Sequence, residues 1–140
     1  MHMRSAAAAA VLLIAIGSTA GCSSTPVRGR AGATLTIDGQ QQGSNLALQC
    51  NQLQSSWFLT INEGEHDATA IVDIDGDKTS VETVTIRGFD QFSGSYWRGG
   101  DGSADATFLN RIFTITGNAA GVGTADHKPR TAAFKIFARC

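Results

Sequence analysis

Residues 131–140 read Thr-Ala-Ala-Phe-Lys-Ile-Phe-Ala-Arg-Cys, and every second residue from Ala132 to Cys140 is apolar. Successive side chains of a β-strand point to opposite faces, so this period-2 pattern predicts a strand with one buried face. Similar alternation recurs along most of the preceding chain. The further predicted strands are residues 33–37, 45–50, 57–61, 68–74, 81–89, 92–97, 104–109 and 112–116.

Turn signals separate these stretches at spacings of about ten residues. Asp38-Gly39, Glu63-Gly64 and Asp75-Gly76 are typical hairpin turns, and Gly99–Gly102 forms another glycine-rich break. We expect the small residues 117–124 to form a loop. No stretch carries helical periodicity over three turns. The sequence therefore predicts an all-β fold, a single antiparallel β-sandwich or closed β-roll of about eight short strands.

Composition limits the functional classes. The chain has 140 residues, which fits one domain, and 11 Lys and Arg residues against 12 Asp and Glu give a net charge of −1. That balance excludes a strongly basic nucleic-acid surface and a highly charged disordered chain. We expect no nucleic-acid partner.

The N-terminal segment has the pattern of an export signal. Polar and basic residues at His2 and Arg4 precede eleven uncharged residues, Ala6 to Ile16. A membrane-spanning helix needs about 20 residues, whereas a run of this length is typical of the apolar part of a signal peptide.

Ala20-Gly21-Cys22 then resembles the bacterial lipobox, in which the cysteine is lipidated and becomes the first residue of the mature protein. Thr19 departs from that pattern, since an aliphatic residue is usual there. We expect a signal peptide over residues 1–21, a lipidated tether over 22–32 and a β domain over 33–140. The alternative is an ordinary secretory signal followed by a chance cysteine.

Two cysteines remain once Cys22 is assigned to lipid. Cys50 and Cys140 both lie on apolar strand faces, and export would place them in an oxidising compartment. We predict a disulfide between them, with two buried free thiols as the alternative.

Asp73, Asp75 and Asp77 form the sharpest candidate for a metal site, because carboxylate oxygens suit calcium. The spacing to Gly76 and Glu82 does not match an EF-hand loop, and the flanks resemble strands. We interpret the segment as an acidic hairpin turn and predict no tight calcium binding, no metal and no cofactor.

Two histidines stand beside aspartates, as His66-Asp67 and Asp126-His127, and we place both in loops. No Gly-x-Ser-x-Gly nucleophile motif accompanies them. The glycine-rich runs 99–102 and 117–121 lack the Lys and the strand-to-helix setting of a phosphate-binding loop, so we interpret both as turns. We therefore predict no catalytic residues and no enzymatic activity.

Phe92, Tyr96, Trp97 and Arg98 crowd into one glycine-rich stretch. Aromatic residues and Arg are enriched at binding hot spots, so we hypothesise a contact surface here. The alternative is that these aromatics cover the end of the core.

Several motifs together resemble the mycobacterial nineteen-kilodalton lipoprotein antigen family. They are Ala20-Gly21-Cys22, Leu35-Thr36-Ile37-Asp38-Gly39, an early Cys50, the stretch from Phe113 to Gly121, and the C-terminal stretch from Phe134 to Cys140. The resemblance covers roughly Thr34 to Cys140 and implies an envelope-anchored surface antigen without established catalytic activity. It also implies host innate receptors as partners of the acylated N-terminus.

We therefore expect a non-enzymatic cell-envelope lipoprotein, anchored extracytoplasmically to the membrane through Cys22, with an interaction or envelope role. The second hypothesis is a small lipid- or ligand-binding lipoprotein. A cavity for a long acyl chain would consume most of the core of so small a domain.

Overall fold

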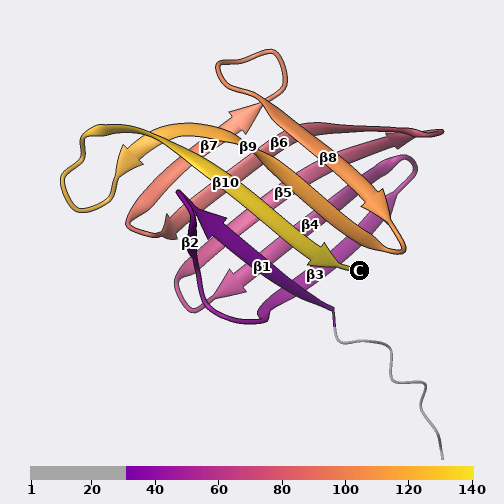
Figure 1. Ribbon diagram of the computed structural model, residues 1–140, viewed down its shortest axis with the longest axis horizontal. Coiled ribbons are helices and arrows are strands. Elements are labelled where there is room, and N and C mark those ends of the chain that lie inside the picture. The colour runs from indigo at the N-terminus through magenta and orange to yellow at the C-terminus, as the bar shows by residue number, and fades with distance from the viewer. Residues whose placement is uncertain (1–30) are drawn as a thin grey trace, which may run out of the picture.

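The computed structural model describes residues 31–140, which form ten strands and no helix (Figure 1). The strands are β1 Gly32–Ile37, β2 Gln40–Gln41, β3 Leu46–Leu53, β4 Ser56–Glu63, β5 His66–Asp75, β6 Lys78–Phe89, β7 Phe92–Trp97, β8 Ala104–Leu109, β9 Ile112–Gly123 and β10 Pro129–Arg139. In this part of the chain, no helix is long and apolar enough to cross a membrane.

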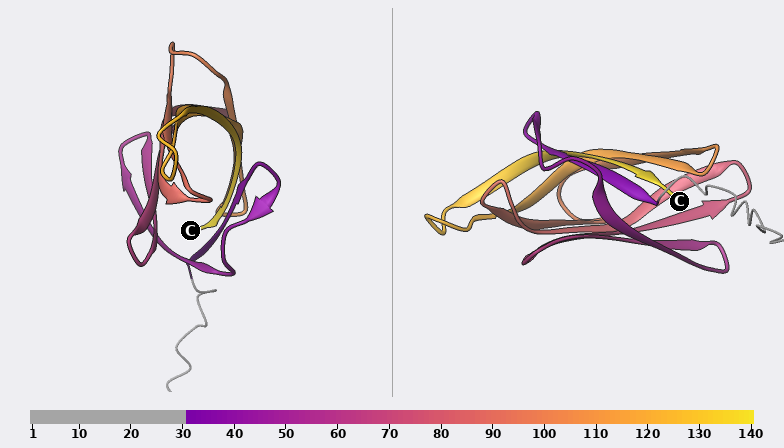
Figure 2. Two further views of the ribbon diagram at one scale, coloured as in Figure 1. Left: turned by 90° about the vertical axis from the view of Figure 1, so that its left-hand side faces the viewer. Right: turned by 90° about the horizontal axis from the view of Figure 1, so that it is seen from below.

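All strand pairs are antiparallel, and eight of the strands close into a ring in the order β1-β3-β4-β5-β6-β7-β9-β10. The ring closes because β10 pairs with β1 on one side and with β9 on the other. Figure 2 shows the closed outline when the roll is viewed from one end. The remaining strands, β2 and β8, pair with β1 and β9 only. The prediction of an all-β antiparallel fold is confirmed, and of the two predicted architectures the structure has the closed roll.

The core follows the predicted alternation. Along β10 the burial pattern alternates without a break, and Ala132, Phe134, Ile136 and Ala138 are all buried. Phe92, Phe113, Leu35 and Ile37 are among the largest side chains with no appreciable exposure. The described residues include no buried polar or charged residue, so packing of apolar side chains from all around the ring dominates the stability of the fold.

The predicted loop over residues 117–124 is wrong, because β9 continues through this segment to Gly123. The first half of β9 pairs with β8 and the second half pairs with β7. At Gly121 a side chain would overlap the backbone of Ser93 and Gly94 in β7. The small residues thus permit a close approach of two strand backbones, where sequence reasoning inferred a loop.

Two irregularities in β6 modify the simple alternation. The register with β5 shifts between Ile71 and Val72, which leaves Glu82 as an extra residue and turns Val81 inward. The backbone carbonyl of Glu82 accepts a hydrogen bond from Arg98 N at 2.8 Å. A second shift at Gly88 lets both Ile86 and Phe89 face the core. Both are β-bulges, which redirect side chains without ending the strand.

Candidate functional site

The roll has two chemically distinct ends. The turns after β1, β4, β6 and β9 lie at one end, which we call the pocket end (Figure 1). The turns after β3, β5 and β8 lie at the other, together with Gly32 at the start of β1 and Cys140 at the C-terminus. We call this second end the terminal end.

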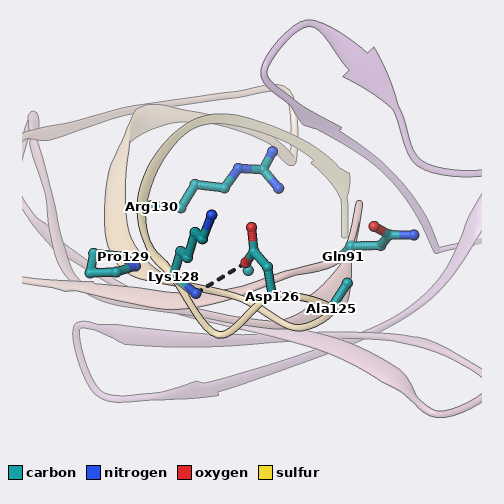
Figure 3. Close-up of a pocket in the computed structure, with 7 residues that line it drawn as sticks. Gln91, Ala125, Asp126, Lys128, Pro129 and Arg130 are labelled. Carbon is teal, nitrogen blue, oxygen red and sulfur yellow. Dashed lines mark hydrogen bonds between the residues drawn. The ribbon is translucent and has the colours of Figure 1, made fainter.

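A pocket of about 330 Å³ lies at the pocket end (Figure 3). The β9–β10 turn with the adjoining ends of both strands, and one residue of the β6–β7 turn, form its wall. The lining residues are Gln91, Gly123, Ala125, Asp126, Lys128, Pro129 and Arg130. Four of the seven, Gln91, Asp126, Lys128 and Arg130, have polar or charged side chains that could bind a small polar molecule.

Backbone hydrogen bonds fix the turn that forms this pocket. Gly123 N donates to Lys128 O at 2.9 Å, and Thr124 N donates to Gln91 O at 2.8 Å, which ties the turn to the neighbouring β6–β7 turn. Asp126 Oδ1 accepts a hydrogen bond from Lys128 N at 3.0 Å. The pocket wall is therefore a defined structure, held by bonds within and between two turns.

Arg130 connects three segments beside the pocket. Its Nη2 lies 2.7 Å from Asp38 Oδ2 in the β1–β2 turn and 2.9 Å from Asp90 Oδ2 in the β6–β7 turn. Its Nη1 donates to Asp90 O at 2.9 Å, and the guanidinium lies 5.3 Å from the centre of the Phe92 ring. We call Arg130, Asp38 and Asp90 the arginine clamp, because together they join β10 to the turns after β1 and β6.

The clamp alters the ionisation of its members. The hydrogen bond from Arg130, together with the one from Ala133 N at 2.9 Å, holds the pKa of Asp38 below its ordinary value. Hydrogen bonds to Asp38 and Asp90 raise the pKa of Arg130. Arg130, Asp38 and Asp90 are all partly exposed, so solvent screens the two ion pairs. The clamp therefore acts mainly by holding β10 and the two turns in position.

Replacing Asp38 with Asn should change how stability depends on pH. A carboxylate whose pKa is lowered by folding contributes stability above its unfolded pKa of about 3.9. That contribution is lost as the pH falls through the folded pKa. We expect D38N to be less stable than the native protein at neutral pH, with the difference shrinking below about pH 4. Urea unfolding at several pH values measures the free energy of unfolding of both proteins, with Asp101→Asn in an exposed loop as the control. If D38N remains less stable than the native protein by the same amount in acid, the prediction is wrong.

The hypothesised contact surface is only partly exposed. Phe92 has 0% exposure and Tyr96 has 8%, so both belong to the core, and their assignment to an exposed surface is wrong. In β7 both side chains point inward into the core, whereas the alternative hypothesis placed these aromatics over the end of the core. Trp97 is 55% exposed, and Arg98 lies on the surface with its Nη1 2.8 Å from Glu82 Oε1. Of the four residues in the hypothesised contact surface, only Trp97 and Arg98 are therefore exposed.

The three aspartates do not converge. Asp73 Oδ1 accepts hydrogen bonds from the hydroxyls of Ser55 and Ser56, at 3.0 and 2.8 Å, in the adjacent β3–β4 hairpin. Asp75 and Asp77 are exposed at the β5–β6 turn. Residues 31–140 contain no group of three or more His, Cys, Asp or Glu side chains placed to hold a metal ion.

The two histidines occupy different settings. His66 is the first residue of β5, not a loop residue as predicted, and its ring lies 5.6 Å from the ring of Phe89. His127 lies in the β9–β10 turn, as expected, with a positive φ of 56°.

Cys50 of β3 and Cys140 form a disulfide, with Cα atoms 5.9 Å apart. Cys22, the predicted lipidation site, lies outside the described residues. The disulfide stands at the terminal end, where Gly32 begins β1 between β3 and β10. β1 pairs with β10 over six residues but with β3 over only two, so the cross-link covers the weakest seam of the ring.

Sequence reasoning missed the arginine clamp and the pocket. Asp38 was recognised only as part of a hairpin turn, and Arg130 carried no motif. Their association depends on ring closure, which brings residues 92 positions apart into contact. A charged residue next to a strand turn is too common to signal such a contact.

Comparison with known proteins identifies the family of this chain. Its residues 26–140 match the family described as Mycobacterium 19 kDa lipoprotein antigen. The chain belongs to this family.

Full-length relatives agree with that assignment. A protein of Mycobacterium avium subsp. hominissuis named as a lipoprotein is 39% identical over 139 residues, covering 94% of this chain and 93% of the relative. The relative named as lipoprotein LppE of Mycobacterium tuberculosis is 36% identical over 134 residues, covering 92% and 91%. A third, from Mycobacterium indicus pranii, is 32% identical over the whole of both chains and is also named as a lipoprotein. None of these three names describes an enzyme.

Proposed function

We propose that this member of the 19 kDa lipoprotein antigen family is a surface-exposed, non-catalytic lipoprotein of the cell envelope. Acylation at Cys22 anchors it on the extracytoplasmic side of the membrane, and the closed roll serves interaction or envelope structure. The observation that carries the proposal is the lipobox-like Ala20-Gly21-Cys22 following an eleven-residue apolar run, in a chain whose relatives are named as lipoproteins.

The fold suits a domain held by its N-terminus. The predicted tether ends where β1 begins at Gly32, and β1 is paired with β10 along its full length. The Cys50–Cys140 disulfide fixes β3 to the end of β10 at the same place. Any tension on the tether would therefore act on a cross-linked part of the ring.

Acyl chains supply the membrane affinity in this proposal. Each buried CH₂ contributes about 0.8 kcal/mol, and a single chain holds a protein only reversibly, whereas two or more anchor it stably. A lipobox cysteine carries a diacylglyceryl group, so Cys22 alone would suffice. The same acylated N-terminus is the part that we expect host innate receptors to recognise.

Replacing Cys22 with Ala tests the anchor. We expect C22A to incorporate no acyl label, because no other site for lipid attachment is proposed, and to be either soluble or still joined to its signal peptide. Metabolic acyl labelling followed by detergent partitioning measures both properties. The adjacent Ser23→Ala variant is the control and should retain label. If C22A is still labelled and still partitions into detergent, the proposed anchor is wrong.

A second candidate function is binding of a small polar ligand in the pocket of the β9–β10 turn. Lys128 and Asp126 present opposite charges there, and Arg130 adds a third charged group (Figure 3). The ring interior, by contrast, is filled by side chains such as Phe92 and Phe113. Within the hypothesis of a ligand-binding lipoprotein, this favours a polar ligand over a lipid. Native mass spectrometry of the protein purified from its own host would reveal a co-purifying molecule.

A further inference from the structure

Two leucines protrude from hairpin tips at the terminal end. Leu109 is 71% exposed at the end of β8, and Leu53 is 67% exposed at the end of β3. They are the most exposed large apolar side chains in residues 31–140. Each stands next to a tight turn, where polar residues are usual. Because both side chains lie at the same end of the roll, we ask which molecule or surface could cover them.

An aromatic cluster connects these two hairpins. Trp57 of β4 lies 5.5 Å from Phe108 and 5.4 Å from Phe113, measured between ring centres. Phe108 and Phe113 stack at 4.3 Å across the β8–β9 hairpin. Because Trp57 belongs to the β3–β4 hairpin and Phe108 precedes Leu109, the cluster fixes the two tips relative to each other. The leucines are therefore presented by rigid elements.

The chain also enters the domain at this end. Gly32 pairs with Arg139, one residue before the C-terminus, and Cys140 N donates to Arg111 O in the β8–β9 turn at 2.9 Å. The start of β1 and the tip bearing Leu109 thus lie at the same end of the roll (Figure 1). The ten Cα–Cα steps from Cys22 to Gly32 reach at most about 35 Å when fully extended, and nine residues lie between the two. Two of them, Arg28 and Arg30, are basic and favour an anionic surface.

The charges of the terminal end define which part of it faces lipid. Arg111 and Arg139 are exposed near the C-terminus, whereas the acidic β5–β6 turn with Asp75 and Asp77 lies beyond the β3–β4 tip as seen from the termini (Figure 1). Anionic lipid attracts the first group and repels the second. The β8–β9 tip is accordingly the centre of the contact, and the β3–β4 tip is its edge.

We propose that Leu109, with Leu53 at the edge of the contact, inserts into the interfacial layer of the bilayer that holds Cys22. This inference rests on the proposed anchoring function. The tether keeps the tips at a high local concentration near lipid, so a contact too weak to hold a free protein becomes populated. The domain then stands on its terminal end, and the pocket at the opposite end points away from the membrane.

Quenching by brominated lipid tests the orientation. The acylated protein carrying W97F is reconstituted in vesicles of phosphatidylcholine with a minor share of phosphatidylglycerol, with or without dibrominated acyl chains. Leu109→Trp adds a reporter at the proposed contact, and Glu65→Trp adds the matched reporter at the exposed β4–β5 turn of the pocket end. Trp57 is common to both variants. We expect brominated lipid to quench the added emission of L109W at least about twofold more than that of E65W, because interfacial groups lie about 5–10 Å deep.

Vesicle flotation separates the two possible failures. If the W97F protein floats with the vesicles but L109W and E65W are quenched equally, the anchor stands and the proposed orientation is wrong. If the protein does not float, anchoring itself fails. Thermal unfolding of both variants verifies folding, and both positions are exposed, so native stability is expected. An L53S/L109S double variant should float normally while losing protection of the terminal end against added protease.

Discussion

Replacing both Cys50 and Cys140 with Ala is expected to lower the free energy of unfolding by about 2–5 kcal/mol. The disulfide joins residues 90 positions apart, and the loss of loop entropy in the unfolded chain corresponds to about 4.6 kcal/mol. A domain of this size has a total stability of about 5–15 kcal/mol. The cross-link therefore accounts for a large part of what keeps the roll folded.

The position of the bond adds a local effect to the global one. Only Gly32 and Ala33 pair with β3 across the β1–β3 seam, and Cys50 lies further along β3, past the residue where β1 begins. Among residues 31–140, no strand pairs with the second half of β3 on that side, so the disulfide is its link there. We expect amide exchange along residues 50–53 to accelerate more than exchange in the β4–β5 pair, because local opening begins where few contacts hold a segment.

Urea unfolding of the non-acylated C22A protein, with and without the C50A/C140A pair, measures the change. The double replacement avoids a free thiol, and reduction of the native bond provides an independent control. An unfolding free energy within about 0.5 kcal/mol of the parent, which is the usual effect of a surface substitution, would contradict the expectation.

The strands were predictable because their signal is local. A strand buried on one face must alternate apolar and polar residues, and β7 and β8 begin and end at the residues that the sequence predicts, 92–97 and 104–109. Burial of Leu59, Ile61 and Ile136 follows from the same rule. Bulges at Glu82 and Gly88 interrupt the rule, and a period-2 pattern cannot locate them without the partner strand.

What the sequence could not indicate is set by contacts between distant segments. Ring closure by β10, the arginine clamp and the aromatic cluster of Trp57, Phe108 and Phe113 each join parts of the chain that lie far apart in sequence. The hypothesised aromatic surface failed for a related reason. Phe92 and Tyr96 occupy inward positions of a strand, whereas their glycine-rich context suggested an exposed contact surface.

The other large effect is expected at Gly121, in the segment that the composition wrongly marks as a loop. Replacing Gly121 with Val should destabilise the protein by about 3 kcal/mol, the upper range for overpacking a tightly filled site. Its Cβ would overlap the Ser93 carbonyl and Gly94 Cα on β7, and backbone yields less readily than a side chain. β9 would have to separate from β7, with which it pairs over only four residues.

Ala120→Val is the matched control for Gly121→Val, since Ala120 neighbours Gly121 on the same strand but is exposed. Valine favours strands, and at this surface position we expect a change within about 0.5 kcal/mol. Urea unfolding of both variants in the C22A background compares them directly. Equal stability of G121V and A120V would mean that β7 and β9 do not approach as closely as the structure places them. A selective loss in G121V would instead show that residues 117–123 form a strand in solution, because a loop would accommodate either side chain.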